Sequence, residues 1–188
     1  MSLHTPHAGR RQFLRNTRKL ALTGAVFSIL PSVSHASLGI RKHHLSLDHT
    51  HTAEKLSVVY RLGDQYVNAA LSRLNRFLRD HYTGVVGIMD PGLYDILDGV
   101  QGALRTDIPY QIISGYRDPH TNERLRKTRG GGVAKKSLHM KGRALDIRLP
   151  GVPLDELRDA ALSLKAGGVG YYPREQFVHV DTGSVRSW

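Results

Sequence analysis

Cysteine is absent from the 188-residue sequence. Its absence excludes disulfide bonds, thiolate metal sites and a cysteine nucleophile together. Any bound metal ion would have to be held by histidine and carboxylate side chains. The chain has 11 histidines, and these are the residues to inspect first.

Acidic residues are scarce beside basic ones. The 27 Lys and Arg against 16 Asp and Glu give a formal net charge of +11, which favours an anionic partner such as nucleic acid, a membrane surface or an acidic wall polymer. Aromatic residues make up only 7% of the chain, few of them lie among the basic residues, and there is no nucleic-acid recognition motif. Nucleic acid is therefore not expected as a partner.

Long apolar runs are also missing. The mostly apolar stretch Leu20–Val33 is shorter than the ~20 residues that span a bilayer, so no stable membrane anchor is expected. It follows a basic region and precedes Ser34-His35-Ala36, a small-x-small cleavage site, which predicts that residues 1–36 are an export signal. The sequence RRQFL at Arg10–Leu14 resembles a twin-arginine signal and implies a bacterial protein exported to the periplasm in the folded state. The alternative is an ordinary basic n-region.

Cleavage after Ala36 would leave residues 37–188 as the mature chain. Five basic residues and no acidic ones lie in the first 36 residues, so the mature chain keeps a net charge of +6. No repeat or long linker divides it, and the apolar content of 40% is enough for a buried core. One domain is predicted.

Hydrophobic periodicity predicts the elements of this domain. Apolar residues recur at helical spacing after Tyr66, Asp90-Pro91 is typical of a helix start, and RALDIRL at 143–149 alternates as a half-buried strand does. Helices are predicted at about 66–80, 91–104, 119–127 and 153–164, and short strands at 110–113, 143–149, 167–173 and 176–183. The predicted class is α+β, with helices packed against a small, mainly antiparallel sheet.

Four histidines gather early in the mature chain: His43, His44, His49 and His51. Their polar, extended context and their closeness to the predicted cleavage site predict an exposed N-terminal segment. We therefore look for a metal site elsewhere.

Two predicted strands combine histidine with aspartate. Asp146 lies on the face of its strand opposite the apolar residues, with His139 just before that strand, and in FVHVD His179 and Asp181 share one face because residues two apart in a strand point the same way. Each pair alone is also typical of a solvated strand face. If the two strands are neighbours, His139, Asp146 and His179 can converge on one Zn²⁺ ion, whose fourth position stays open for water. Asp181 is then a candidate general base.

Four motifs, in this order, resemble one protein family. They are SGYRDPHTN (114–122), SLHMKGRALDIRL (137–149), GGVGYYP (167–173) and FVHVDTGSVRSW (177–188). Together they are similar to the YcbK-like murein endopeptidases, a branch of the zinc D-alanyl-D-alanine peptidase superfamily that shares its fold with hedgehog signalling domains. The similarity extends over nearly all of residues 43–188.

This resemblance implies a zinc peptidase domain over residues 37–188, with zinc bound by His139, Asp146 and His179. It also implies that the substrate is peptidoglycan, cleaved at peptide bonds in its stems or cross-links. The arginine of the SGYR motif, Arg117, would lie beside the metal, where a guanidinium can hold a substrate carbonyl or carboxylate and stabilise an oxyanion.

One position departs from the family pattern. Carboxypeptidase branches commonly have a glutamate three residues before the last zinc histidine, and here that position is Gln176, which is not a useful proton acceptor. Asp181 is the predicted substitute base, with Glu175 as the other possibility. Ser137 and Tyr116 are expected to line the cleft.

Two other functions stay open at this point. One is a non-catalytic, zinc-containing module that binds the cell wall, and the other is a D,D-carboxypeptidase. The sequence fixes neither the bond that is cut, D,D or L,D, nor the oligomeric state.

Overall fold

The computed structural model describes residues 40–128 and 132–188. The predicted export signal, residues 1–36, lies outside this part of the chain. The described elements are, in order, β1 (Lys42–His49), β2 (Lys55–Leu62), β3 (Gln65–Tyr66), α1 (Asn68–Phe77), α2 (Gly92–Leu104), β4 (Tyr110–Ser114), α3 (Pro119–Thr128), the 3₁₀ turn η1 (Leu138–Lys141), β5 (Ala144–Arg148), α4 (Leu154–Ser163), β6 (Gly168–Tyr172), β7 (Phe177–Asp181) and β8 (Arg186–Ser187). Among these residues, no helix is both long enough and apolar enough to cross a membrane.

Eight strands form one mixed sheet in the order β3-β2-β1-β4-β5-β7-β6-β8. Only the pairs β1–β4 and β6–β8 are parallel among the described strands, so the predicted α+β class and the mainly antiparallel pairing are confirmed. The sheet is larger than predicted. The segment before α1 folds into the β1–β2 hairpin and joins β4 through β1, a long-range pairing that local sequence patterns do not encode.

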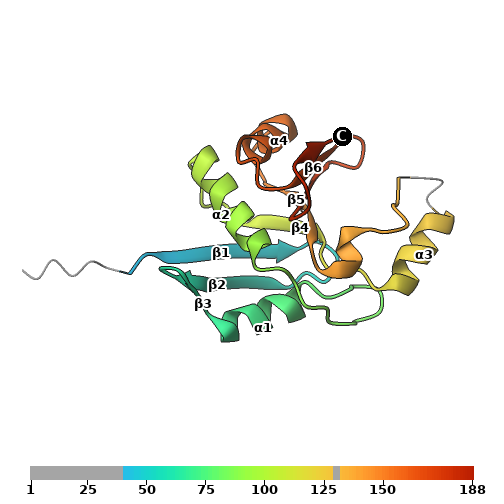
Figure 1. Cartoon of the computed structure of the whole chain (residues 1–188), viewed down its shortest axis with the longest axis horizontal. Helices are drawn as coiled ribbons and strands as arrows, with labels where there is room; N and C mark the ends of the chain where they lie inside the picture. The colour runs from blue at the N-terminus through green and yellow to red at the C-terminus, as the bar shows by residue number, and fades with distance from the viewer. Residues whose placement is uncertain (1–39, 129–131) are drawn as a thin grey trace, which may run out of the picture. The chain divides into compact units, whose positions relative to one another are not determined.

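Helices α1, α2 and α4 cover one face of the sheet. Leu45 of β1 and Val58 of β2 are direct partners across the hairpin, and both belong to the apolar core beneath α1 and α2. Tyr110 of β4 points to the same side, where its hydroxyl donates to the carbonyl of Leu97 in α2 at 3.0 Å. Figure 1 shows α2 and α4 next to each other and α3 well apart from them. The core thus lies on one side of the sheet, and the strand residues that alternate with it point to the other side.

Two predictions about exposure are wrong. His43 and His49 are only 6% and 2% exposed, because they lie on the helix-covered face of β1, where His43 contacts Asp98 and the His49 ring packs against Phe77. His44 and His51 are exposed, as predicted. Strand β5 is not half-buried either, since all residues from Ala144 to Ile147 are buried. Its neighbours β4 and β7 pair along both edges, and polar groups cover its second face.

Candidate metal centre

Strands β5 and β7 are neighbours, which was the condition for a shared site. They pair antiparallel, and Asp146 is the direct register partner of His179. Leu145 and Ile147 point into the core, so Asp146 and His179 both point to the opposite face of the sheet. The strand alternation therefore brings these two side chains together.

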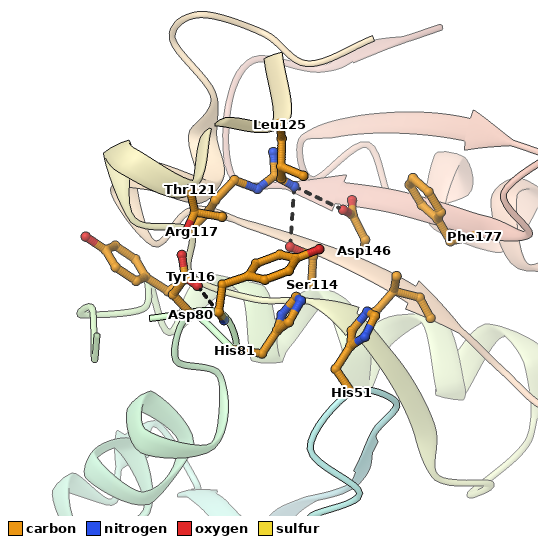
Figure 2. Close-up of a pocket in the computed structure, with 12 residues that line it drawn as sticks. His51, Asp80, His81, Ser114, Tyr116, Arg117, Thr121, Leu125, Asp146 and Phe177 are labelled. Atoms are coloured by element: carbon orange, nitrogen blue, oxygen red, sulfur yellow. Dashed lines mark hydrogen bonds and ion pairs between the residues drawn. The ribbon is translucent and has the colours of Figure 1, made fainter. Parts of the chain in front are cut away.

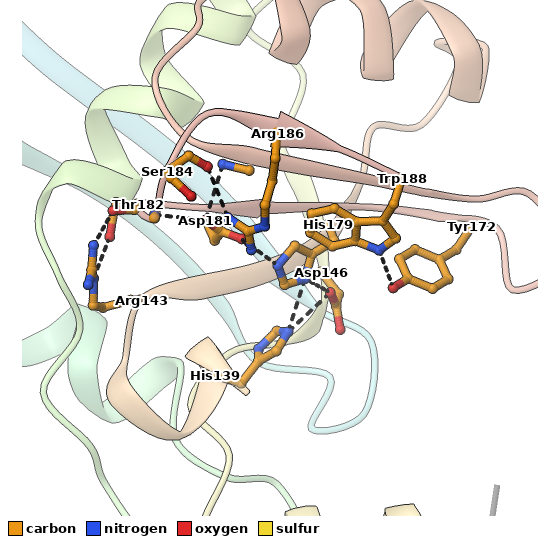
Figure 3. A network of polar contacts seen from close by, with 12 residues as sticks. His139, Arg143, Asp146, Tyr172, His179, Asp181, Thr182, Ser184, Arg186 and Trp188 are labelled. Atoms are coloured by element: carbon orange, nitrogen blue, oxygen red, sulfur yellow. Dashed lines mark hydrogen bonds and ion pairs between the residues drawn. The ribbon is translucent and has the colours of Figure 1, made fainter. Parts of the chain in front are cut away.

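His139 reaches the same point from the turn η1. Its Nε2 lies 3.2 Å from Asp146 Oδ1 and 3.3 Å from His179 Nδ1, while His179 Nδ1 lies 2.8 Å from Asp146 Oδ1. His139 is 3% exposed, Asp146 6% and His179 9%. Figure 3 shows the three side chains converging.

The turn that carries His139 ends abruptly at Gly142. This residue has φ +64°, and a Cβ there would lie 1.9 Å from the carbonyl oxygen of Ile88. Only glycine combines the left-handed backbone with this close approach. The chain can therefore reverse from η1 into β5 within a few residues, which places His139 over Asp146.

Each imidazole is held by a second hydrogen bond on its other nitrogen. His139 Nδ1 donates to the carbonyl oxygen of Gly115 at 2.8 Å, so its Nε2 keeps the lone pair that faces Asp146. His179 Nε2 lies 3.2 Å from Asp181 Oδ2, which leaves Nδ1 facing the same point. Such outer contacts fix the tautomer and orientation of metal-binding histidines.

The electrostatics of the group suit a bound cation. Burial alone would raise the pKa of Asp146, but the charges and hydrogen bonds of His139 and His179 hold it well below its usual range. Burial lowers the pKa of His139. Burial would also lower the pKa of His179, yet its hydrogen bonds with Asp146 and Asp181 outweigh this and raise it to about 9. An ionised carboxylate between two imidazoles is a nitrogen-and-oxygen donor set typical of Zn²⁺, and it fits that ion.

Asp181, the predicted base, lies beside His179 Nε2, the ring nitrogen that does not face Asp146. It is fully buried, and its carboxylate also accepts hydrogen bonds from the backbone amides of Gly168 and Gly183 and from the guanidinium of Arg186. Burial would raise its pKa, but the hydrogen bonds from His179, Arg186 and the amides keep it well below the usual range. Its contacts are those of a group that orients His179.

Arg117 lies on the other side of Asp146. Its Nη2 is 3.7 Å from Asp146 Oδ2 and 3.4 Å from Ser114 Oγ, and its Nη1 is 3.4 Å from Asn122 Oδ1. The guanidinium therefore lies next to the three-residue group.

Asp146 and Arg117 line a small cleft with about 430 Å³ of empty space, the open solvent at its mouth included. Tyr116, Ser114 and Phe177 are also in its wall, with His51 and His81 at the side opposite Arg117 (Figure 2). Tyr116 thus lines the cleft as expected. Ser137 is buried at the start of η1 and is not among the residues that line this cleft.

Glu175 and Gln176 lie in the exposed turn between β6 and β7. Gln176 donates to the carbonyl of Pro173, so its side chain is used within the turn. Glu175 precedes His179 by four residues and belongs to this turn, outside strand β7.

Sequence reasoning missed two residues beside the centre, Trp188 and Arg186. The Trp188 ring packs against His179 with 5.3 Å between ring centroids, and Arg186 binds Asp181. Both positions depend on the pairing of β8 with β6, which no local pattern indicates.

Comparison with known proteins finds similar chains over nearly the whole length of this one. A family model described as peptidoglycan L,D-endopeptidase MepK matches residues 37–188. The chain is 46% identical over 181 residues to the peptidoglycan L,D-endopeptidase MepK of Escherichia coli K12, covering 94% of this chain and 99% of that protein. It is 39% identical over 179 residues to a probable peptidoglycan L,D-endopeptidase MepK of Haemophilus influenzae, covering 93% and 96% respectively.

Proposed function

The chain belongs to the peptidoglycan L,D-endopeptidase MepK family, and we infer from this that it hydrolyses peptide bonds in peptidoglycan. It is a murein endopeptidase of the M15 peptidase superfamily. The names of its relatives favour an L,D bond as the bond that is cut. The observation that carries the proposal is the convergence of His139, Asp146 and His179 beside Arg117.

We propose Zn²⁺ as the metal of this family member. His139 Nε2, His179 Nδ1 and Asp146 Oδ1 are the atoms that would hold it, since these three face one another. When bound, zinc polarises a substrate carbonyl and lowers the pKa of a bound water to about 7.

The protein residues contribute orientation and charge. Arg117 is placed to bind the carbonyl oxygen of the scissile bond and to stabilise the negative charge that develops on it. Asp146 Oδ2, 3.7 Å away, keeps the guanidinium directed at the site. We propose that Asp181 positions His179, in place of the base role predicted from the sequence, because its oxygens already accept hydrogen bonds from four donors. Glu175 stays a predicted base that Glu175→Gln would test.

The substrate also indicates where the protein acts. A peptidoglycan hydrolase works outside the cytoplasmic membrane, in the periplasm or beyond it. We propose the periplasm, reached through a twin-arginine signal at residues 1–36 that is removed after Ala36. The net charge of +6 on residues 37–188 suits an anionic wall polymer. Mass spectrometry of the N-terminal peptide from a periplasmic fraction tests the cleavage position, and replacing Arg10 and Arg11 with lysine tests the export route.

The decisive experiment is digestion of cross-linked murein by the purified mature protein, with and without added zinc. Chromatography of the muropeptides should show zinc-dependent loss of cross-linked species, and the surviving stems identify the bond. Release of terminal D-alanine alone would indicate a carboxypeptidase. Zinc binding without any change in the muropeptides would indicate a wall-binding module. His139→Ala serves as the inactive control.

A further inference from the structure

The segment Arg186–Trp188 lies directly over one of the proposed metal ligands. Trp188 extends the pairing of β8 with β6, since its amide donates to Val169 and its carbonyl accepts from Tyr171 at 2.9 Å. The neighbouring β6 residue is Gly170, which is the register partner of His179. A Cβ at Gly170 would lie 2.7 Å to 2.9 Å from three atoms of the indole, so the ring occupies space that only glycine leaves free.

The indole is fixed in this place by contacts on several sides. Its Nε1 donates to the hydroxyl of Tyr172 at 2.8 Å, and its ring is 5.3 Å from the ring of His179. The guanidinium carbon of Arg186 lies 4.8 Å from the indole centroid, a distance typical of a cation–π contact.

Arg186 connects the same segment to Asp181. Its Nη2 lies 2.6 Å from Asp181 Oδ2 and its Nη1 lies 3.2 Å from Oδ1. The guanidinium of Arg186 therefore binds both oxygens of the Asp181 carboxylate, and this carboxylate also contacts His179 Nε2. One short segment thus contacts the imidazole of His179 through Trp188 and its hydrogen-bond partner through Arg186, as Figure 3 shows.

Core formation does not account for this arrangement. Trp188 is 50% exposed and is not part of the apolar core. Its large ring is instead placed against a histidine whose Nδ1 faces Asp146. An imidazole turns readily about its χ2 torsion, and the two contacts together restrict that rotation.

We propose that Arg186 and Trp188 form a clasp that fixes the orientation of His179 and thereby sets the affinity and the coordination geometry of the metal site. The inference rests on the proposed function in so far as His179 binds the metal. Both are positioning residues. Loss of an outer contact of this kind lowers metal affinity about 10-fold to 100-fold.

The test measures metal binding in the mature protein. Zinc affinity is determined by competition with a chromophoric chelator, and the coordination geometry by the visible absorption of the Co²⁺-substituted protein. The variants are Trp188→Ala, Trp188→Phe and Tyr172→Phe. Val185→Ala is the matched control, because this residue directly precedes the segment and its side chain is 64% exposed.

We expect Trp188→Ala to lower zinc affinity about tenfold or more and to alter the Co²⁺ spectrum. Trp188→Phe keeps a ring against His179 and should restore most of the affinity. Tyr172→Phe should have the same zinc affinity as Trp188→Phe, because both changes remove the same hydrogen bond. The double variant should bind zinc no more weakly than either single variant. Val185→Ala should behave as wild type.

Unchanged zinc affinity and an unchanged Co²⁺ spectrum in Trp188→Ala would overturn the clasp. If Trp188→Ala does not fold, Arg186→Gln decides the matter in its place, because it removes the guanidinium that binds both oxygens of Asp181. A zinc affinity and a Co²⁺ spectrum equal to wild type in that variant would overturn the clasp. Failure of the proposed function is separate: wild-type protein would bind zinc and leave murein intact, while the affinities would still decide for or against the clasp.

Discussion

Asp181 contacts His179 at Nε2, the ring nitrogen opposite the one that faces Asp146, with 3.2 Å between Asp181 Oδ2 and Nε2. The two residues are separated by one position in β7, so the strand itself brings the carboxylate to the imidazole. This geometry makes Asp181 the hydrogen-bond acceptor that selects the tautomer of His179.

Asp181→Asn should therefore weaken metal binding. The amide cannot provide the same charged acceptor to His179 Nε2, and we expect zinc affinity to fall about 10-fold to 100-fold, with most activity restored by excess zinc. Chelator competition and murein digestion at several zinc concentrations measure both effects. A loss of activity that excess zinc does not restore, with wild-type zinc affinity, would instead support the base role.

Arg117→Lys should separate charge from geometry at the cleft. Lysine keeps a positive charge near Asp146 but not the planar fork, so we expect kcat/KM to fall about 100-fold while zinc affinity changes less than about threefold. Kinetics on a purified cross-linked muropeptide and chelator competition check these values. Arg148→Lys, on the same sheet but binding the carbonyl of Gln176, is the control.

Metal removal should lower the stability of the folded protein. A ligand that binds only the native state at 1,000 times its Kd contributes about 4 kcal/mol to the free energy of unfolding. We expect chelation to lower the Tm of wild-type protein and zinc to restore it, whereas His139→Ala should show little change with either. Calorimetry with and without zinc measures the difference. Equal Tm values for wild type in both conditions would contradict a metal at this centre.

Two histidines outside the metal centre should make stability depend on pH. Burial lowers the pKa of His49 to about 4, helped by the nearby charges of His81 and His51, and burial likewise lowers the pKa of His81 to about 4. Unfolded histidines titrate near 6.5, so between pH 6.5 and 4 the unfolded chain binds protons that the folded chain does not.

The free energy of unfolding should therefore fall as the pH drops from about 6.5 to 4. For the pair we expect a loss of about 3–5 kcal/mol, with allowance for solvent screening at His81. Denaturant unfolding in the presence of chelator, repeated across this pH range, measures the effect. The free energy of unfolding should depend less on pH in the His49→Gln, His81→Gln double variant than in wild type. An equal pH dependence of the free energy of unfolding in the variant and in wild type would contradict the assignment of this effect to His49 and His81.

The strand pattern predicted much of the centre, because side-chain alternation is a local property. RALDIRL and FVHVD alone define which faces Asp146 and His179 occupy. Whether those faces meet depends on the pairing of β5 with β7, which the sequence left as a condition. His139 could be placed only as far as the loop before β5, since its final position depends on the reversal at Gly142.

The burial of individual side chains was less predictable from the sequence than the face of the strand on which they lie. The polar segment around His43 and His49 predicts that they are exposed. In β1, however, they share one face with Leu45 and Leu47, and α1 and α2 cover this face. Nothing in residues 42–49 indicates that a later strand, β4, will pair with them. The contacts of Arg186 and Trp188 follow the same rule, because they exist only through the parallel pairing of β8 with β6.

The chain contains one tryptophan, Trp188, and its ring lies 5.3 Å from that of His179. Its fluorescence therefore comes from a single, known position beside the metal centre. A quenching ion such as Co²⁺ bound to His179 would lower the tryptophan emission of the protein, and its displacement by Zn²⁺ would restore that emission. The unlabelled wild-type protein is thus its own optical sensor of site occupancy, in solution and in real time.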